Sequence, residues 1–166
     1  ELLRTERTTV GRLDSRYKGV DRDAGGDSFE YDPSYSAIQE PYTAAWNAYV
    51  RTELGFHHQP DITYEIIANL YEKWDYSKFM GQYVNVADTL RKAMSTNRHL
   101  RVHVASAYYD LATPYFATEY TLAHLGLEGE LRENISTSSY ESGHMMYVRL
   151  EDLAKLKEEL AGFIAG

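Results

Sequence analysis

The stretch LRVHVASAYYDLATP, residues 100–114, decides the fold of this chain. Apolar residues recur at every second position of its first part: Leu100, Val102 and Val104. This period of two predicts a strand over residues 100–106, with one face buried. Thr113-Pro114 is typical of an N-cap followed by the first residue of a helix. We therefore expect a strand, a loop that carries Asp110, and a helix, in that order.

The same unit is then repeated. The expected helix after Pro114 has an apolar face and a glycine near its end: Phe116, Tyr120, Ala123, Leu127 and Gly126. Residues 134–140 favour a strand, and a loop with His144 follows. Apolar residues at helical spacing close the chain: Leu150, Leu153, Leu156, Leu160, Phe163 and Ile164. Two such units predict a right-handed crossover between two parallel strands.

Asp110 and His144 both come directly after one of these strands. Loops at the carboxyl ends of parallel strands are where α/β sheets place their ligands. An α/β-hydrolase presents its triad in the order Ser, Asp or Glu, His, with the serine on a G-x-S-x-G turn. These 166 residues contain no such turn. The sequence thus offers two candidate members of a triad without the third; alternatively, Asp110 is a turn residue and His144 an ordinary loop histidine.

The first half of the chain is less regular. Residues 1–34 are polar and rich in turn formers, so we expect loops with at most short strands. We interpret GRLDSR, residues 11–16, as a solvated surface whose charges pair with one another. A helix is predicted from Pro41, with Tyr42 to Leu54 at helical spacing and Gly55 as its C-terminal cap. A second is predicted from the N-cap Asn85 to Asn97.

Composition excludes several classes of protein. The chain is 43% hydrophobic and 25% charged, as in soluble globular proteins, and no apolar run reaches the roughly 20 residues of a membrane helix. A formal charge of −8 argues against nucleic acid as a partner. Without Cys, thiol nucleophiles and Cys-based metal sites are absent. His57-His58 lacks a spaced third ligand, so we expect no metal and no cofactor.

The motifs YYDLATP, residues 108–114, and YESGHMMY, residues 140–147, resemble the C-terminal part of the bacterial serine carboxypeptidases of the S10 peptidase class. GRLDSR, residues 11–16, and Asp32-Pro33-Ser34 are similar to the cap region of that group. The resemblance covers nearly the whole chain and is strongest after residue 83. It implies an α/β class with the last strands and helices of an α/β-hydrolase fold in residues 84–166, preceded by a cap-like, loop-rich and helical segment in residues 1–83.

By this resemblance Asp110 matches the triad acid, His144 the triad base, and Met145 a position bordering the leaving-group pocket. The reaction implied is release of C-terminal residues from peptides with a free C-terminus, through an acyl-serine, in the periplasm or outside the cell. Ala107 stands where the group commonly carries Gly, and Ser142 where it commonly carries Ala. Both are exchanges among small residues, so we expect the geometry to persist.

The chain alone is expected to be inactive, because the nucleophile, the oxyanion hole and most of the substrate-binding groups belong to a front half. We expect the chain to be a segment of a longer protein. Two alternatives stay open: another α/β-hydrolase such as an esterase, acyltransferase or aminopeptidase, and a non-enzymatic scaffold or subunit. An isolated pair of parallel strands leaves an edge and an apolar face open. We therefore expect self-association or a front-half chain that carries the serine.

Overall fold

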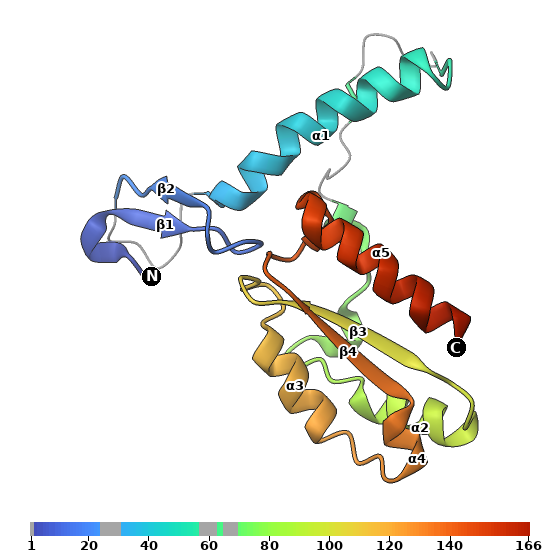
Figure 1. Ribbon diagram of the computed structural model, residues 1–166. Coiled ribbons are helices and arrows are strands. Elements are labelled where there is room, and N and C mark those ends of the chain that lie inside the picture. Colours follow the sequence, from blue (N-terminus) through green and yellow to red (C-terminus); the bar gives the residue numbers. More distant parts are fainter. Residues whose placement is uncertain (1, 24–30, 57–62, 65–69) are drawn as a thin grey trace.

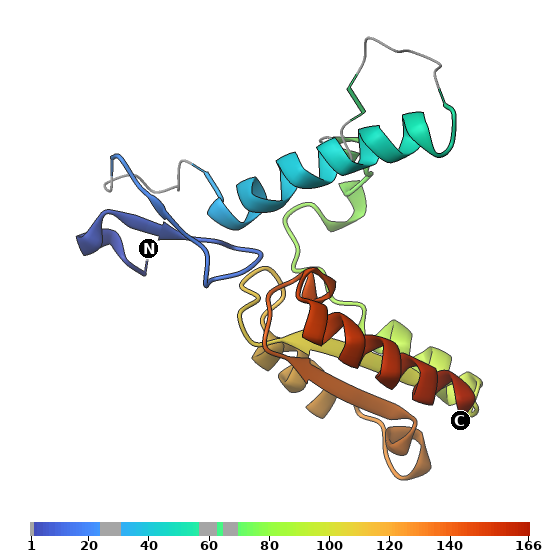
Figure 2. The same ribbon diagram turned by 45° about the horizontal axis from the view of Figure 1, so that its top comes forward.

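The computed structural model describes residues 2–23, 31–56, 63–64 and 70–166. The C-terminal half is built on two parallel strands, β3 (Val102–Ala107) and β4 (Ile135–Tyr140), as predicted. Their register runs from Val102 opposite Ile135 to Ala107 opposite Tyr140. α2 and α3 lie on one side of these strands and α5 on the other (Figures 1 and 2). The arrangement is mixed helix and strand, compatible with an α/β class.

The core lies between β3, β4 and α2 (Ala87–Thr96). α2 begins two residues after Asn85, and its N-cap is Val86 rather than the predicted Asn85. The side chain of Asn85 still accepts a hydrogen bond from the backbone N–H of Ala87 at 2.9 Å. The buried centre is formed by three apolar side chains, with six more packed around it: Met94, Leu125 and Leu127, then Ala87, Leu90, Leu100, Val102, Leu131 and Ile135. Leu100 and Val102 pack against this centre as the alternation predicts, but Val104 does not, and β3 is partly buried at alternate positions on both faces rather than on one.

α3 (Tyr115–Ala123) differs from the prediction in two ways. Pro114 is its N-cap rather than its first residue, and no side chain caps it. The expected apolar face is wrong, because Phe116 and Tyr120 are 67% and 60% exposed. The buried leucines of this region follow the helix, where Gly126 takes a positive φ of 72° and turns the chain back toward the core.

α4 (Glu130–Glu133) is a single turn before β4, and the 3₁₀ helix η4 (Met146–Val148) precedes α5 (Leu150–Ala165). α5 matches the predicted helix but meets the sheet partly through polar groups. The hydroxyl of Tyr140 donates to Glu159, and the ammonium of Lys155 donates to the carbonyl of Ser139 at 2.8 Å. At its two ends Leu150 and Ile164 are 77% and 81% exposed. Part of the predicted apolar face is thus open.

Replacing Tyr140 by phenylalanine should change the stability of the protein in alkali. Burial and the hydrogen bond to Glu159 raise the pKa of Tyr140 to about 12 from an ordinary value of 10.0. The neutral hydroxyl therefore contributes fully below pH 10, and its contribution is lost as the pH rises toward 12. Urea unfolding between pH 8 and 12 should show a smaller alkaline loss of stability in Tyr140→Phe than in the parent. Tyr83→Phe is the control, because Tyr83 is 93% exposed and its replacement should leave the pH dependence of the parent unchanged. Equal pH dependence in Tyr140→Phe and the parent would contradict this account.

The N-terminal part forms the 3₁₀ helix η1 (Arg4–Glu6) and an antiparallel hairpin of β1 (Thr8–Val10) and β2 (Lys18–Val20). The short strands agree with the prediction. Residues 11–17, the hairpin loop, connect β1 to β2. Its tip points toward the loops that follow β3 and β4 (Figure 1).

α1 (Pro33–Thr52) begins eight residues before the predicted start at Pro41. Asp32 is the N-cap, because its carboxylate accepts hydrogen bonds from the backbone N–H groups of Ser34 and Tyr35 at 2.9 and 3.2 Å. Pro33 then occupies the first helical turn, and Pro41 lies inside the helix. The predicted start at Pro41 is therefore wrong, because Asp32 is a strong N-cap before Pro33 whereas Glu40 before Pro41 is not. Gly55, predicted as the cap, has a positive φ of 60° just beyond the end.

The 3₁₀ helices η2 (Leu70–Lys73) and η3 (Ser77–Phe79) connect α1 to α2. His57 and His58 lie outside the described residues. Within the part of the chain that the structure describes, no three His, Asp or Glu side chains gather as a metal site would need. None of the described helices is long and apolar enough to cross a membrane.

Candidate functional site

Asp110 and His144 are in direct contact. Nδ1 of His144 lies 2.8 Å from Oδ2 of Asp110. Because Ala107 and Tyr140 are paired at the carboxyl ends of parallel strands, the two following loops leave the sheet at the same edge. Tyr109 N–H also donates to the carbonyl of Ser142 at 3.1 Å, which joins these loops beyond the strands. The hydrogen bond expected from chain order and strand placement is present.

The carboxylate of Asp110 is buried, with 5% of the residue exposed, and it is fully hydrogen-bonded. Oδ1 accepts from the backbone N–H groups of Ala112 and Thr113 at 2.7 and 2.9 Å. Oδ2 accepts from the Thr113 hydroxyl at 2.6 Å and from His144. Burial raises the pKa of Asp110, but the hydrogen bonds from Thr113, His144 and Ala112 outweigh it and lower the pKa below its usual value. Asp110 thus stabilises the fold as a carboxylate, and this contribution is lost as the pH falls through the lowered pKa.

The imidazole of His144 is accessible on one side. Its side chain is 43% exposed, and its backbone N–H donates to the carbonyl of Leu13 at 2.6 Å. Nδ1 faces Asp110, so Nε2 lies on the opposite side of the ring. Among the described residues Nε2 has no hydrogen-bond partner. With a proton on Nδ1, the Nε2 lone pair is free to accept a proton from another group.

The hairpin loop docks onto both of these loops, which corrects the prediction of a solvated surface at residues 11–16. Ser15 N–H donates to the carbonyl of Tyr109 at 2.9 Å, and Leu111 N–H donates to the carbonyl of Arg12 at 3.0 Å. The carbonyl of Leu13 accepts from His144. These main-chain contacts leave no signature in the sequence, because they depend on backbone groups that every residue carries.

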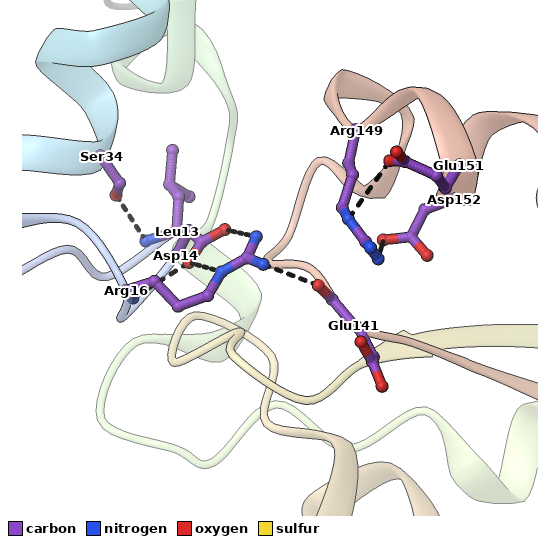
Figure 3. A network of polar contacts seen from close by, with 8 residues as sticks. All are labelled: Leu13, Asp14, Arg16, Ser34, Glu141, Arg149, Glu151 and Asp152. Carbon is purple, nitrogen blue, oxygen red and sulfur yellow. Dashed lines mark hydrogen bonds and ion pairs between the residues drawn. The ribbon is translucent and has the colours of Figure 1, made fainter.

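Arg16 anchors this docking through a charge pair that the sequence already suggested. Its guanidinium binds Asp14 by two hydrogen bonds, Nη2 to Oδ2 at 2.6 Å and Nε to Oδ1 at 3.0 Å. Nη1 donates to the carbonyl of Glu141, 125 positions away, at 2.7 Å (Figure 3). The guanidinium also lies over the ring of Tyr109 at 4.7 Å. The hydrogen bond to Asp14 raises the pKa of Arg16. A pair that is local in sequence thus holds the loop before His144.

Further groups in the same view support this arrangement. The Ser34 hydroxyl accepts from the backbone N–H of Leu13 at 3.1 Å, which ties the hairpin loop to α1 (Figure 3). At the start of α5, Arg149 lies 3.2 Å from Asp152 and 3.4 Å from Glu151. This second charge cluster links Arg149, which precedes α5, to two carboxylates in the first turn of that helix.

Gly143 and Ser142 are packed without spare room. A Cβ on Gly143 would lie 2.2 Å from the carbonyl oxygen of Leu13 and 2.5 Å from Cβ of Asp14. Glycine is therefore needed for the approach of the hairpin loop. Ser142 is fully buried, and its hydroxyl has no partner among the described residues. Ala107 is likewise buried, so both positions at which the sequence departs from the resembled motifs demand small side chains.

Met145 follows His144 and faces the hairpin loop rather than the sheet. It lines a small cavity of about 20 Å³ together with Leu13, Tyr17, Ile38 and Val148. A cavity of this size holds about one water molecule. The structure therefore places Met145 beside the site, and its role at a leaving-group pocket stays a prediction.

Two residues of the site were not singled out from the sequence. Thr113 was interpreted as a helix cap, and Arg16 as part of a solvated surface. The signal for Thr113 was its spacing from Asp110, since a Thr three residues after an Asp can satisfy that carboxylate in a turn. For Arg16, the nearby Asp14 was the only feature of the sequence that indicated a role.

Comparison of the chain with protein families, curated proteins and solved structures found no match.

Proposed function

We propose that this chain carries the acid and the base of a serine hydrolase triad, with Asp110 as the acid and His144 as the base. The observation that supports it most is the 2.8 Å hydrogen bond between a buried carboxylate and an accessible imidazole at the ends of paired parallel strands. A structural ion pair has no need of an open Nε2. A general base needs that atom open, because it receives the proton there.

In this proposal each side chain has one task. Asp110 holds the imidazole in the tautomer with a proton on Nδ1 and stabilises the imidazolium that forms. His144 takes the serine proton on Nε2 as the serine attacks a carbonyl carbon, then delivers it to the leaving group. The low pKa of Asp110 supports the first task, since the carboxylate keeps its charge through the cycle.

The serine comes from polypeptide outside these 166 residues, on a G-x-S-x-G turn. The open surfaces of the described chain support a covering partner of this kind. Exposed apolar side chains lie on opposite sides of a sheet that has two strands in the described residues: Leu150 and Ile164 on α5, and Phe116 and Tyr120 on α3. Solvent exposure of such faces is unfavourable, and burial against further polypeptide removes it.

The substrate class follows from the resemblance to serine carboxypeptidases. The whole protein then releases C-terminal residues from peptides with a free C-terminus through an acyl-serine, with residues 84–166 as the end of an α/β-hydrolase fold and residues 1–83 as a cap. Met145 borders the leaving-group pocket, and the protein acts in the periplasm or outside the cell. An esterase, acyltransferase or aminopeptidase is the runner-up, because the fold does not choose among them.

The test uses the complete gene product and the 166-residue chain side by side. The upstream sequence should contain a G-x-S-x-G turn. The complete protein should shorten N-blocked peptides with a free C-terminus and leave the C-terminally amidated peptides intact, whereas the chain alone should do neither at enzyme-like rates. Cleavage of simple esters without trimming of peptides would favour the esterase. Enzyme-like trimming by the chain alone would contradict the assignment of the serine to another segment.

The exposed apolar faces also favour a second candidate, in which the chain is a non-enzymatic subunit or scaffold. In that case the chain assembles with copies of itself or with another protein and has no missing serine. Light scattering measures whether the chain self-associates, and mixing it with the polypeptide encoded upstream measures whether that segment binds. A stable monomer that does not bind the upstream segment would eliminate both the scaffold candidate and the proposed polypeptide that covers the apolar faces.

A further inference from the structure

The side chain of Thr113 contacts both members of the Asp110 and His144 pair. Its Oγ1 donates to Oδ2 of Asp110 at 2.6 Å and lies 3.2 Å from Nδ1 of His144. The backbone N–H of the same residue donates to Oδ1 of Asp110 at 2.9 Å. Thr113 therefore binds both oxygens of the carboxylate while its hydroxyl touches the imidazole.

The count of donors and acceptors shows what this contact does. An ionised carboxylate has about four lone-pair sites, and Asp110 has four donors for them. Oδ1 receives two backbone N–H groups, and Oδ2 receives the Thr113 hydroxyl and Nδ1 of His144. Since the hydroxyl proton is used on Oδ2, Thr113 offers Nδ1 only a lone pair. Both oxygen atoms near Nδ1 are then acceptors, which favours a proton on Nδ1.

We propose that the hydroxyl of Thr113 is a positioning group that holds the Asp110 carboxylate and thereby selects the Nδ1–H tautomer of His144. The inference concerns the neutral imidazole of this chain and stands without any hydrolysis; only its value for catalysis rests on the proposed function. Nε2 is left with a free lone pair on the exposed side of the ring. A histidine that acts as a base needs that state before the serine arrives.

The local structure shows that this hydroxyl has no competing task. Threonine before a helix ordinarily caps it through its side chain, yet α3 has no side-chain cap. The Thr113 hydroxyl donates to Asp110 instead of capping α3. Thr113 is also an exposed residue, so its replacement removes little buried surface. A changed His144 in a Thr113 variant thus reports the hydroxyl rather than a disturbed core.

The test is nuclear magnetic resonance of the 166-residue chain, with ¹⁵N in the imidazoles and ¹³C in the carboxyl groups. In the parent, the neutral His144 ring should show a proton on Nδ1 and none on Nε2. Thr113→Val keeps the shape of the side chain but lacks the hydroxyl; its ring should show a mixture of the two tautomers, and the Asp110 titration midpoint should move upward. Thr113→Ser keeps the hydroxyl and should restore both parent signals.

Thr118→Val is the matched control, because Thr118 lies on α3 and its hydroxyl makes no hydrogen bond among the described residues; it should leave both signals unchanged. Amide spectra verify folding, and Thr113→Ala replaces Thr113→Val if the latter does not fold. Parent-like signals from a folded variant without the hydroxyl would overturn the proposal, as would a folded Thr113→Ser that fails to restore them. The readout needs no activity, so a failed peptidase assay leaves it intact.

Discussion

Under the proposed function, replacing His144 by alanine in a protein that also carries the serine should lower kcat by about 10⁶, because loss of the base in a Ser-His-Asp triad removes the concerted action of all three members. Asp110→Asn should lower kcat by about 10⁴, since an amide in place of the carboxylate favours the wrong tautomer of His144. The double variant should be no worse than His144→Ala alone, because the members act as one unit. KM should change little in each case. The measurement is steady-state trimming of a peptide with a free C-terminus.

His99→Ala is the control for this series, because His99 is an exposed histidine outside the site. Its kcat should equal that of the parent. Circular dichroism of each variant separates lost chemistry from lost folding. If His144→Ala keeps a substantial part of the parent kcat while folded, the pair is a structural contact and the proposed function fails.

Replacing Gly143 by alanine should cost about 3 kcal/mol of the free energy of unfolding, at the upper end of overpacking effects. The new Cβ meets backbone and Cβ atoms of Leu13 and Asp14 at 2.2 to 2.7 Å, where no flexible side chain can move aside. The loop cannot retreat without breaking the hydrogen bond from His144 N–H to the carbonyl of Leu13. We therefore expect the hairpin loop to separate from the His144 loop. Urea unfolding measures the cost, and the amide shift of His144 shows the separation.

Gly162→Ala is the matched control for this substitution. Gly162 lies in α5, and a Cβ there has no neighbour within 4 Å. Alanine should raise stability by about 0.5 to 1 kcal/mol, because it reduces the backbone entropy lost in forming a helix. A Gly143→Ala variant as stable as the parent, with an unchanged His144 amide, would show that the hairpin loop is not held against this site.

The predictions that succeeded depend on patterns within a few residues. The alternation at Leu100, Val102 and Val104 indicated β3, because a strand with one buried face imposes a period of two. Asn85 indicated the start of α2 to within two residues, although Val86 and not Asn85 is the N-cap. Placement of Asp110 and His144 after paired strands then followed from the parallel connection, which brings carboxyl ends to one edge of a sheet.

The predictions that failed depend on which partner reaches a residue. The start of α1 is an exception: Asp32 caps backbone N–H groups two and three residues ahead, so that signal is local, whereas Glu40 before Pro41 is not a preferred N-cap. Phe116 and Tyr120 have helical spacing but lie on a face that nothing in the described chain covers. Residues 11–16 are charged and therefore suggested a solvated surface. The pair of Asp14 and Arg16 allows the Asp14 carboxylate to be buried where the loop docks, because mutual hydrogen bonds offset its loss of water.

The order of elements, the parallel strand pair and the edge that carries Asp110 and His144 were all readable from residue spacing, because hydrogen bonding within helices and strands repeats at fixed periods. Three features were not: the docking of the hairpin loop, the close approach that requires glycine at position 143, and the use of the Thr113 hydroxyl on Asp110. Each depends on backbone or side-chain groups that meet across the fold, such as Arg16 and Glu141, which are 125 positions apart. The periodicity of residues within a helix or strand does not predict such contacts, because only the folding of the chain brings those groups within hydrogen-bond distance.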